Sequence, residues 1–282
     1  MQFNLAISQI NGSADQIQQI TPWLKLPEQV VALGQTNASG TVSGRLDNVI
    51  ADLELQSDLG TITTALHVSQ IDDELNYDGT ITIPEINIQD IFPNAPVGIA
   101  AGTLTANGFG TNLTTLKGDI KGQLDYIELN NYTYRNVLVN GNITDQIFKG
   151  AIDIDDKNLQ LAFNGLLNLS DTLPQIESHL NIKHADLYAL KLYKSPFNVA
   201  LDGQVNITGD DLSNINGSLD LASLHIENDS NSVDFDTTIF KIRSEPHFKA
   251  YDIINDQMVA HVEGDYDPIV LTNELQRYFT NY

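Results

Sequence analysis

Hydrophobic and polar residues alternate through most of this chain, most regularly in its middle. In residues 148–182 apolar side chains take nearly every second position, with polar ones such as Lys149, Asn164 and Glu177 between them. A period of two with one polar face is typical of half-buried β-strands. The apolar runs are separated by residues 155–158 and 170–174, which are rich in turn-forming residue types. Links this short join antiparallel neighbours, so a meander of long strands is predicted here.

The same alternation recurs, with varying regularity, on both sides of this segment. We expect further strands in residues 1–10, 40–56, 61–68, 75–83, 98–106, 118–129, 134–143, 197–207, 215–221, 224–226 and 233–239. Because so little helix lies between the strands, the predicted fold class is all-β: a long antiparallel meander with few short helices. We expect it to be a single continuous segment, residues 1–282.

Short helices are predicted towards the two ends. Ser13 is a suitable N-cap for one helix, and Pro27 opens a second helix that ends at Gly34. Near the C-terminus apolar residues recur at helical spacing, so residues 268–280 are expected to form an amphipathic helix. Two shorter excursions from strand structure are expected at residues 86–92 and 184–190.

A loose repeat points to hairpins as a recurring device. The runs from Gly102 to Gly118 and from Gly203 to Gly217 are similar in the spacing of their glycines and of the aliphatic residues between them. They start about a hundred residues apart, which is longer than the period of about 20 to 50 residues in solenoid repeats. We interpret each run as a strand, a glycine-flanked turn with a buried leucine, and a second strand.

Composition narrows the possible partners. The chain has 14 Lys and Arg against 37 Asp and Glu, and its net charge of −23 repels nucleic acid and anionic lipid surfaces. It has no cysteine, which excludes disulfides, thiolate metal sites and cysteine nucleophiles. No apolar run of about 18 residues marks a transmembrane helix.

No motif for catalysis, a metal or a cofactor emerges from the sequence. There is no nucleophile elbow, and the Gly-Phe-Gly of residues 108–110 lacks the third glycine of a nucleotide-binding loop. The six histidines are scattered, and Asp153, Asp155 and Asp156 lack the glycine and glutamate that complete a calcium loop. We therefore expect no enzyme activity, no catalytic residues, no cofactor and no metal site.

Two groups of residues in the middle of the chain together resemble one family. They are Tyr126, Tyr132, Tyr134, Asn136, Gly141, Asp156, Asn158, Leu159, Gly165, Leu169 and Ser170, followed by Lys183, His184, Ala185, Asp186, Leu187, Leu190 and Leu192. This succession resembles the TamB branch of the AsmA-like proteins, the translocation and assembly module of Gram-negative envelopes, and most closely its Bacteroidetes members. The resemblance extends over residues 3–278.

The resemblance implies a shape and a location. The sheet would be curled into an elongated, U-shaped, taco-like trough with a concave apolar groove. The full-length protein would be anchored in the inner membrane of a Gram-negative bacterium and would cross the periplasm. A C-terminal segment would engage an outer-membrane barrel assembly partner. Neither the anchor nor that segment is recognised in residues 1–282, so we expect an internal fragment of a longer protein.

The apolar face of each strand has to be covered by a second sheet, by the curled sheet itself or by a ligand. Glycines expected on that face favour curling, namely Gly122, Gly150, Gly165, Gly203 and Gly217. If the curl stays open, the groove can bind phospholipid acyl chains; if it closes, the same residues form a dry core. The predicted lipid-binding residues are Ile152, Ile154, Leu159, Leu161, Phe163, Leu167, Leu169, Leu180, Ile182, Val199, Leu201, Val205 and Ile207.

Two functions from different classes follow. The first is a bridge-like conduit that carries phospholipid acyl chains along the groove between inner and outer membranes. The alternative is a scaffold that assists translocation and assembly of outer-membrane β-barrel proteins by pairing strand edges. A carbohydrate-binding or adhesin domain would require a regular ladder of exposed aromatic residues, and the aromatic residues here are not regularly spaced.

Overall fold

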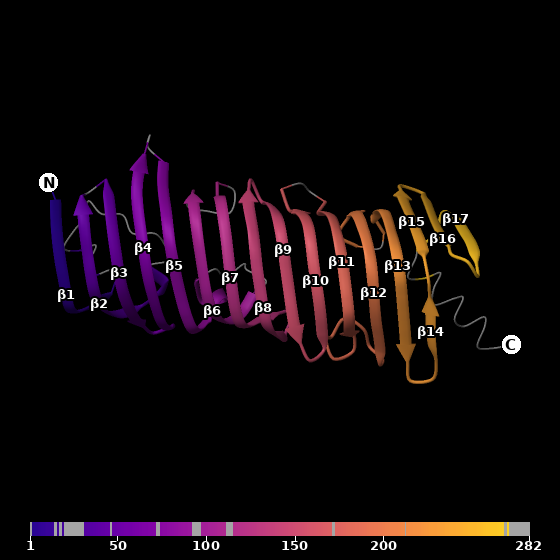
Figure 1. The fold of residues 1–282 in the computed structure, drawn as a ribbon, viewed down its shortest axis with the longest axis horizontal. Coiled ribbons are helices and arrows are strands. Elements are labelled where there is room, and N and C mark those ends of the chain that lie inside the picture. The colour runs from indigo at the N-terminus through magenta and orange to yellow at the C-terminus, as the bar shows by residue number, and fades with distance from the viewer. Residues whose placement is uncertain are drawn as a thin grey trace. The chain divides into compact units, whose positions relative to one another are not determined.

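The computed structural model describes residues 2–13, 16, 19, 31–45, 47–71, 74–91, 97–110, 115–170, 173–211, 213–267 and 270. Strands make up 76% of these residues and form one open, antiparallel meander sheet of 17 strands (Figure 1). The complete helix among the described residues, α3 (Ile88–Ile91), has four residues. The predicted all-β class and antiparallel meander are therefore confirmed.

The chain divides into two compact units, Met1–Asp145 with Ile152–Lys157 and Gln146–Ala151 with Asn158–Tyr282, called unit 1 and unit 2 below. Unit 1 contains the strands β1 (Gln2–Ser13), β2 (Gln35–Arg45), β3 (Asn48–Ser57), β4 (Gly60–Ile71), β5 (Glu74–Asn87), β6 (Val97–Phe109), β7 (Lys117–Leu129) and β8 (Tyr132–Thr144). The strand β9 (Ile147–Asp156) has residues in both units. Unit 2 contains β10 (Leu159–Asn168), β11 (Gln175–Asp186), β12 (Phe197–Thr208), β13 (Asn216–Asn228), β14 (Ser232–Phe235), β15 (Thr238–Glu245), β16 (Phe248–Ile254) and β17 (Val259–Gly264).

Within each unit, strands that pair are close in the sequence (Figure 1). The register places apolar residues opposite apolar residues, as where Val49 of β3 is opposite Val68 of β4. Polar residues are opposite polar residues, as where the Thr80 and Thr105 hydroxyls of β5 and β6 lie 3.0 Å apart. Since side chains alternate across a pleated strand, each unit has one apolar face and one polar face.

Bulges keep the apolar face continuous where the alternation breaks. In unit 1 the register of β5 and β6 shifts between Ile83 and Ile86. In unit 2 the register of β11 and β12 shifts in the same way between Ile182 and Ala185. In each case one strand contains an extra residue. Ile83 and Ile86 in β5 therefore both lie on the apolar face, as do Ile182 and Ala185 in β11. A bulge also bends its strand and increases the local twist.

Some predicted strand boundaries were wrong. Residues 40–56 are not one strand: they belong to the hairpin of β2 and β3. Residues 233–239 are divided between β14 and β15. Conversely, residues 215–221 and 224–226 contribute to the single strand β13, because a bulge there moves the apolar positions by one residue.

The repeat predicted from the glycines corresponds to two similar hairpins. Residues 110–116 join β6 to β7 and residues 209–215 join β12 to β13, so both connections have seven residues. Gly110 and Gly209 open these connections with φ angles of 98° and 132°, which favour glycine. The leucines predicted to be buried in the turns, Leu113 and Leu212, lie outside the described residues.

Described residues flank the predicted helices. The Gln16 N–H donates to the Ser13 hydroxyl (3.4 Å) and the Ser13 N–H donates to the Gln16 side chain (3.0 Å), which is a capping box. Gly34 has a φ of 68°, the left-handed conformation of a helix C-cap. Most of the helices predicted in residues 14–33 and 268–280 lies outside the described residues. Among the residues described, no helix has the length and apolar character to cross a bilayer.

Candidate functional site

The candidate site is the apolar face of β10–β13 in unit 2. Antiparallel register aligns its side chains in rows that run across the strands. One row consists of Leu161, Ile182, Leu201 and Leu224. The next row consists of Phe163, Leu180, Gly203 and Leu221. A third consists of Leu167, Ile176, Ile207 and Gly217. Rows of this kind produce a continuous apolar strip across four strands.

The structure brings most of the predicted groove residues to this face. The register places the following of them on it: Leu159, Leu161, Phe163, Leu167, Leu180, Ile182, Val199, Leu201, Val205 and Ile207. Leu169 follows the last residue of β10 and is 52% exposed, so it lies beyond the strand. Ile152 and Ile154 lie on β9 in unit 1 and are half-buried.

The prediction missed the continuation of the face beyond β12. Leu219 of β13 is opposite Val205 of β12 and Phe240 of β15, and Phe240 is in turn opposite Ile253 of β16. The alternation in these strands was visible in the sequence. The bulge in β13 and the division between β14 and β15 obscured that all of it belongs to one face.

Glycines lie on the same face, as expected, and at Gly165, Gly203 and Gly217 the adjacent backbone approaches closely. By register Gly165, Gly203 and Gly217 lie on the apolar face of unit 2, and Gly122 lies on that of unit 1. A Cβ at Gly203 would lie 2.4 Å from the Asp220 carbonyl oxygen, so an alanine there requires a backbone shift. The remaining predicted position, Gly150, lies on β9.

This face is apolar without being closed. Among the described residues of β10–β13, the register places no Asp, Glu, Lys, Arg or His side chain on it. Most of its aliphatic side chains are half-buried; Leu221 (2% exposed) and Val205 (7%) are among the few that are fully covered. Ser178, opposite Gly165, is buried with a hydroxyl that has no hydrogen-bond partner among the described groups. The face therefore retains apolar surface that a ligand can cover.

The polar face of unit 2 carries histidine–carboxylate pairs between neighbouring strands. His179 of β11 lies 3.3 Å from Asp202 of β12, and His225 of β13 lies 2.7 Å from Asp234 of β14. Each pair joins adjacent strands. These pairs are on the face opposite the apolar strip.

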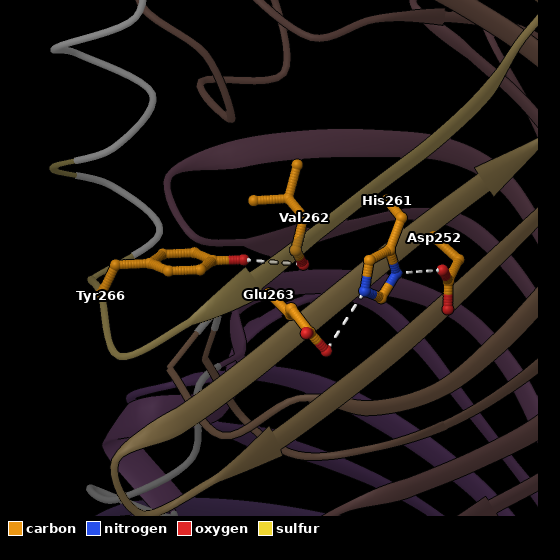
Figure 2. Close-up of polar contacts among 5 residues, drawn as sticks. All are labelled: Asp252, His261, Val262, Glu263 and Tyr266. Atoms are coloured by element: carbon orange, nitrogen blue, oxygen red, sulfur yellow. Dashed lines mark hydrogen bonds and ion pairs between the residues drawn. The ribbon is translucent and has the colours of Figure 1, made fainter.

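His261 of β17 shows the most developed of these arrangements (Figure 2). Its Nδ1 lies 2.6 Å from Asp252 Oδ1 of β16, and its Nε2 lies 3.2 Å from Glu263 Oε2. The hydrogen bonds to Asp252 and then Glu263 raise the pKa of His261. Lys241 and Arg243 line a shallow depression of 250 Å³ beside it. Because both ring nitrogens face carboxylate oxygens, the imidazolium is favoured and neither nitrogen is available as a general base.

The residues that carry the family resemblance have structural contacts in unit 1. The Tyr132 hydroxyl donates to Asp156, whose side chain is buried, and the Asn136 amide donates to the Asp155 carbonyl oxygen (3.0 Å). The rings of Tyr132 and Tyr134 meet edge to face at 4.8 Å. These contacts tie the strand β8 to the end of β9. No group of His, Asp and Glu among the described residues has the arrangement of a metal site.

The candidate site thus consists of an uncharged, partly open apolar strip backed by a hydrogen-bonded polar face. Comparison of the chain with protein-family models, curated proteins and solved structures finds no match.

Proposed function

We propose that the apolar face of β10–β13 binds phospholipid acyl chains. In this proposal the chain is a periplasmic segment of a bridge-like protein that carries lipid between the inner and outer membranes of a Gram-negative envelope. The observation that carries the proposal is the set of mostly half-buried apolar rows across β10–β13, on which the register places no charged side chain. The likeness of residues 126–170 and 183–192 to the TamB branch supports the envelope location.

The half-buried side chains of this face leave apolar surface in contact with water. Each acyl methylene that leaves water for this face contributes about 0.8 kcal/mol. Adjacent strands lie about 4.8 Å apart, so β10 to β13 provide a strip about 14 Å across, long enough for a large part of one acyl chain. A charged side chain on the strip would oppose binding, because its desolvation is costly.

The competing explanation is that the strip is a dry core, covered by other parts of the protein and not by a ligand. A closed core and a binding face differ in what a charged substitution does. On a binding face that is open to a ligand, the new charge can reach water, so folding is retained and lipid binding is lost. In a closed core, the same charge unfolds the protein.

Leu161 and its neighbour Ala162 provide a matched test, since Leu161 lies on the apolar strip and Ala162 is exposed on the polar face. We expect Leu161→Asp to lower the uptake of a fluorescent phospholipid by roughly tenfold or more. Ala162→Asp adds the same charge on the other face and should leave uptake unchanged. Thermal melting of each purified variant reports whether it is folded.

A photoreactive phenylalanine analogue at Leu161 keeps the position apolar and so separates binding from folding. In cells we expect it to form a lipid adduct, whereas the same analogue at Ala162 forms none. Absence of an adduct at Leu161, together with unfolding of Leu161→Asp, would establish a dry core and overturn the proposal. An adduct with protein alone would point to a scaffold instead.

A further inference from the structure

The connection between β11 and β12, residues 187–196, exposes several large hydrophobic side chains. Tyr188 is 55% exposed, Leu192 59% and Tyr193 55%. Every residue from 191 to 196 is exposed, so this part of the loop projects from the ends of strands β11 and β12. Isolated apolar residues on a surface need no explanation, but three in one loop of ten residues form a patch.

The loop is nevertheless ordered by its own contacts. The Leu190 side chain is 1% exposed and anchors the loop, and the Leu190 N–H donates to the Asp186 carbonyl (3.0 Å). The N–H groups of Leu192 and Tyr193 both donate to the Leu187 carbonyl, at 2.9 and 3.0 Å. The Tyr193 ring packs on Phe197 with centroids 5.4 Å apart. The patch is therefore preformed, which reduces the entropy lost on binding.

The charge of the loop is opposite to that of the chain. The whole chain has a net charge of −23, but residues 187–196 contain Lys191 and Lys194 and no carboxylate. The corresponding connection between β5 and β6, residues 88–96, contains Asp90 and no lysine. The fold thus does not require lysines at this place. At physiological salt, charges more than about 8 Å away are screened, so the two lysines are opposed mainly by the carboxylates at this end of the strands. These include Asp186, whose Oδ1 accepts from the Ala189 N–H (2.9 Å), and Glu227, which is opposite Asn198.

We propose that the β11–β12 loop is an anchor for anionic lipid surfaces. Tyr188, Leu192 and Tyr193 enter the interfacial region of the bilayer, where tyrosine is favoured because one end of the ring is apolar and the other is polar. Lys194 and Lys191 then lie at the level of the phosphate groups. The loop lets this end of strands β11 and β12 bind a membrane that the net charge of the chain would otherwise repel.

A bilayer fits this patch better than a protein partner does. A stable protein interface buries about 800 Å² on each side, usually over 20 to 30 residues. Here the apolar residues are few, project from a loop and are accompanied by lysine, which is depleted at the centre of protein interfaces. Shallow insertion of a few side chains combined with attraction to anionic headgroups suits a membrane surface.

This inference does not depend on the proposed function. Binding of acyl chains concerns the face of β10–β13, whereas membrane attachment concerns residues 187–196 alone. Leu161→Asp should therefore leave membrane attachment intact, and loop variants should leave phospholipid uptake intact. Failure of one proposal can be distinguished from failure of the other.

The test uses flotation of the 282-residue chain with vesicles of phosphatidylcholine, with and without phosphatidylglycerol. We expect flotation only with phosphatidylglycerol. The double variant Leu192→Ser/Tyr193→Ser should abolish it, and Lys194→Glu should weaken it by roughly fivefold or more. The matched controls are Val259→Ser, which removes a 77% exposed valine, and Lys149→Glu, which reverses a charge at an exposed position of β9. Both should float like the parent chain.

Because the chain has no cysteine, a single introduced cysteine can be labelled specifically. The label then measures insertion of the loop directly. A single cysteine at Ser195, labelled with an environment-sensitive dye, should report an apolar surrounding when anionic vesicles are added. The same dye at Ser213, exposed in the connection between β12 and β13 at the opposite end of the strands, should remain in water. Equal flotation of the loop variants and the parent, or a dye at position 195 that stays in water, would overturn the proposal. A Ser195 label that contacts only protein in cells would also count against it.

Discussion

Tyr132 and Asp156 illustrate how single side chains join neighbouring strands. Asp156 is 3% exposed and accepts a hydrogen bond from the Tyr132 hydroxyl. Burying a carboxylate is costly unless polar groups surround it, so this bond lowers the cost of placing Asp156 at the end of β9. The contact lies within unit 1 and involves two of the residues on which the family resemblance rests.

We predict that Tyr132→Phe destabilises the protein by about 1–3 kcal/mol, because it removes one partner from a buried carboxylate while keeping the ring. Urea unfolding followed by circular dichroism measures the change. Tyr188→Phe removes a hydroxyl from a 55% exposed ring and should change stability by no more than about 0.5 kcal/mol. Equal effects of the two substitutions would show that the bond to Asp156 contributes nothing specific.

His261 gives the polar face a dependence on pH. Its pKa is raised by the bonds to Asp252 and Glu263, and Lys241 of β15 is opposite Asp252 on the next strand. A histidine whose pKa is higher in the folded state stabilises the fold when it is protonated. Its contribution is complete below the ordinary pKa of 6.5 and is lost as pH rises through the higher folded value.

We therefore expect His261→Gln to lower the melting temperature at about pH 5.5, with the difference from the parent shrinking towards about pH 8.5. Melting curves across this range, with an NMR titration of the His261 ring, measure the effect. His67→Gln is the control, because the His67 ring bonds to the uncharged Asn48 amide (3.0 Å). A deficit that does not change with pH would mean that charge is not involved.

At the level of paired strands, the distance between neighbouring backbones decides which glycines can be replaced by alanine. A Cβ at Gly203 would lie 2.4 Å from the Asp220 carbonyl oxygen and 2.7 Å from the Leu221 Cα. At Gly122, also on an apolar face, the nearest atom is the Leu104 Cδ2 at 3.0 Å. A leucine methyl can move, whereas a backbone carbonyl in a paired strand cannot move without breaking the ladder.

We predict that Gly203→Ala costs more than about 1 kcal/mol of stability and that Gly122→Ala costs distinctly less. Paired urea titrations with the two variants test this. If Gly122→Ala were the more harmful substitution, packing of side chains rather than backbone approach would set the constraint.

The alternation of apolar residues was sufficient to predict strands such as β10, because one covered face imposes a period of two. It was not sufficient where an extra residue enters a strand. The step from Leu221 to Leu224 in β13 hides that both belong to one face, and only the register with β12 reveals it. The turn inside residues 40–56 was missed although the period breaks there: Val42 is opposite Ala51, so the apolar positions pass from even numbers in β2 to odd numbers in β3.

For the whole molecule, the sequence predicted which residues share a face but not how far that face is covered. Leu161 and Val205 have the same pattern around them, yet Leu161 is half-buried and Val205 is 7% exposed. Burial depends on what lies above a residue, which alternation does not encode. The lysine-containing loop of residues 187–196 was likewise hidden, because its exposed side chains follow no period.

A sheet whose strands pair with their neighbours in the sequence has a consequence for how it is made. No strand described in β10–β13 waits for a partner synthesised much later, so each can be added to the preceding one as the chain leaves the ribosome. The same locality lets a hairpin be inserted or deleted while the remaining pairs keep their register, as in repeat proteins. Length is therefore a property that evolution can adjust in steps of one hairpin.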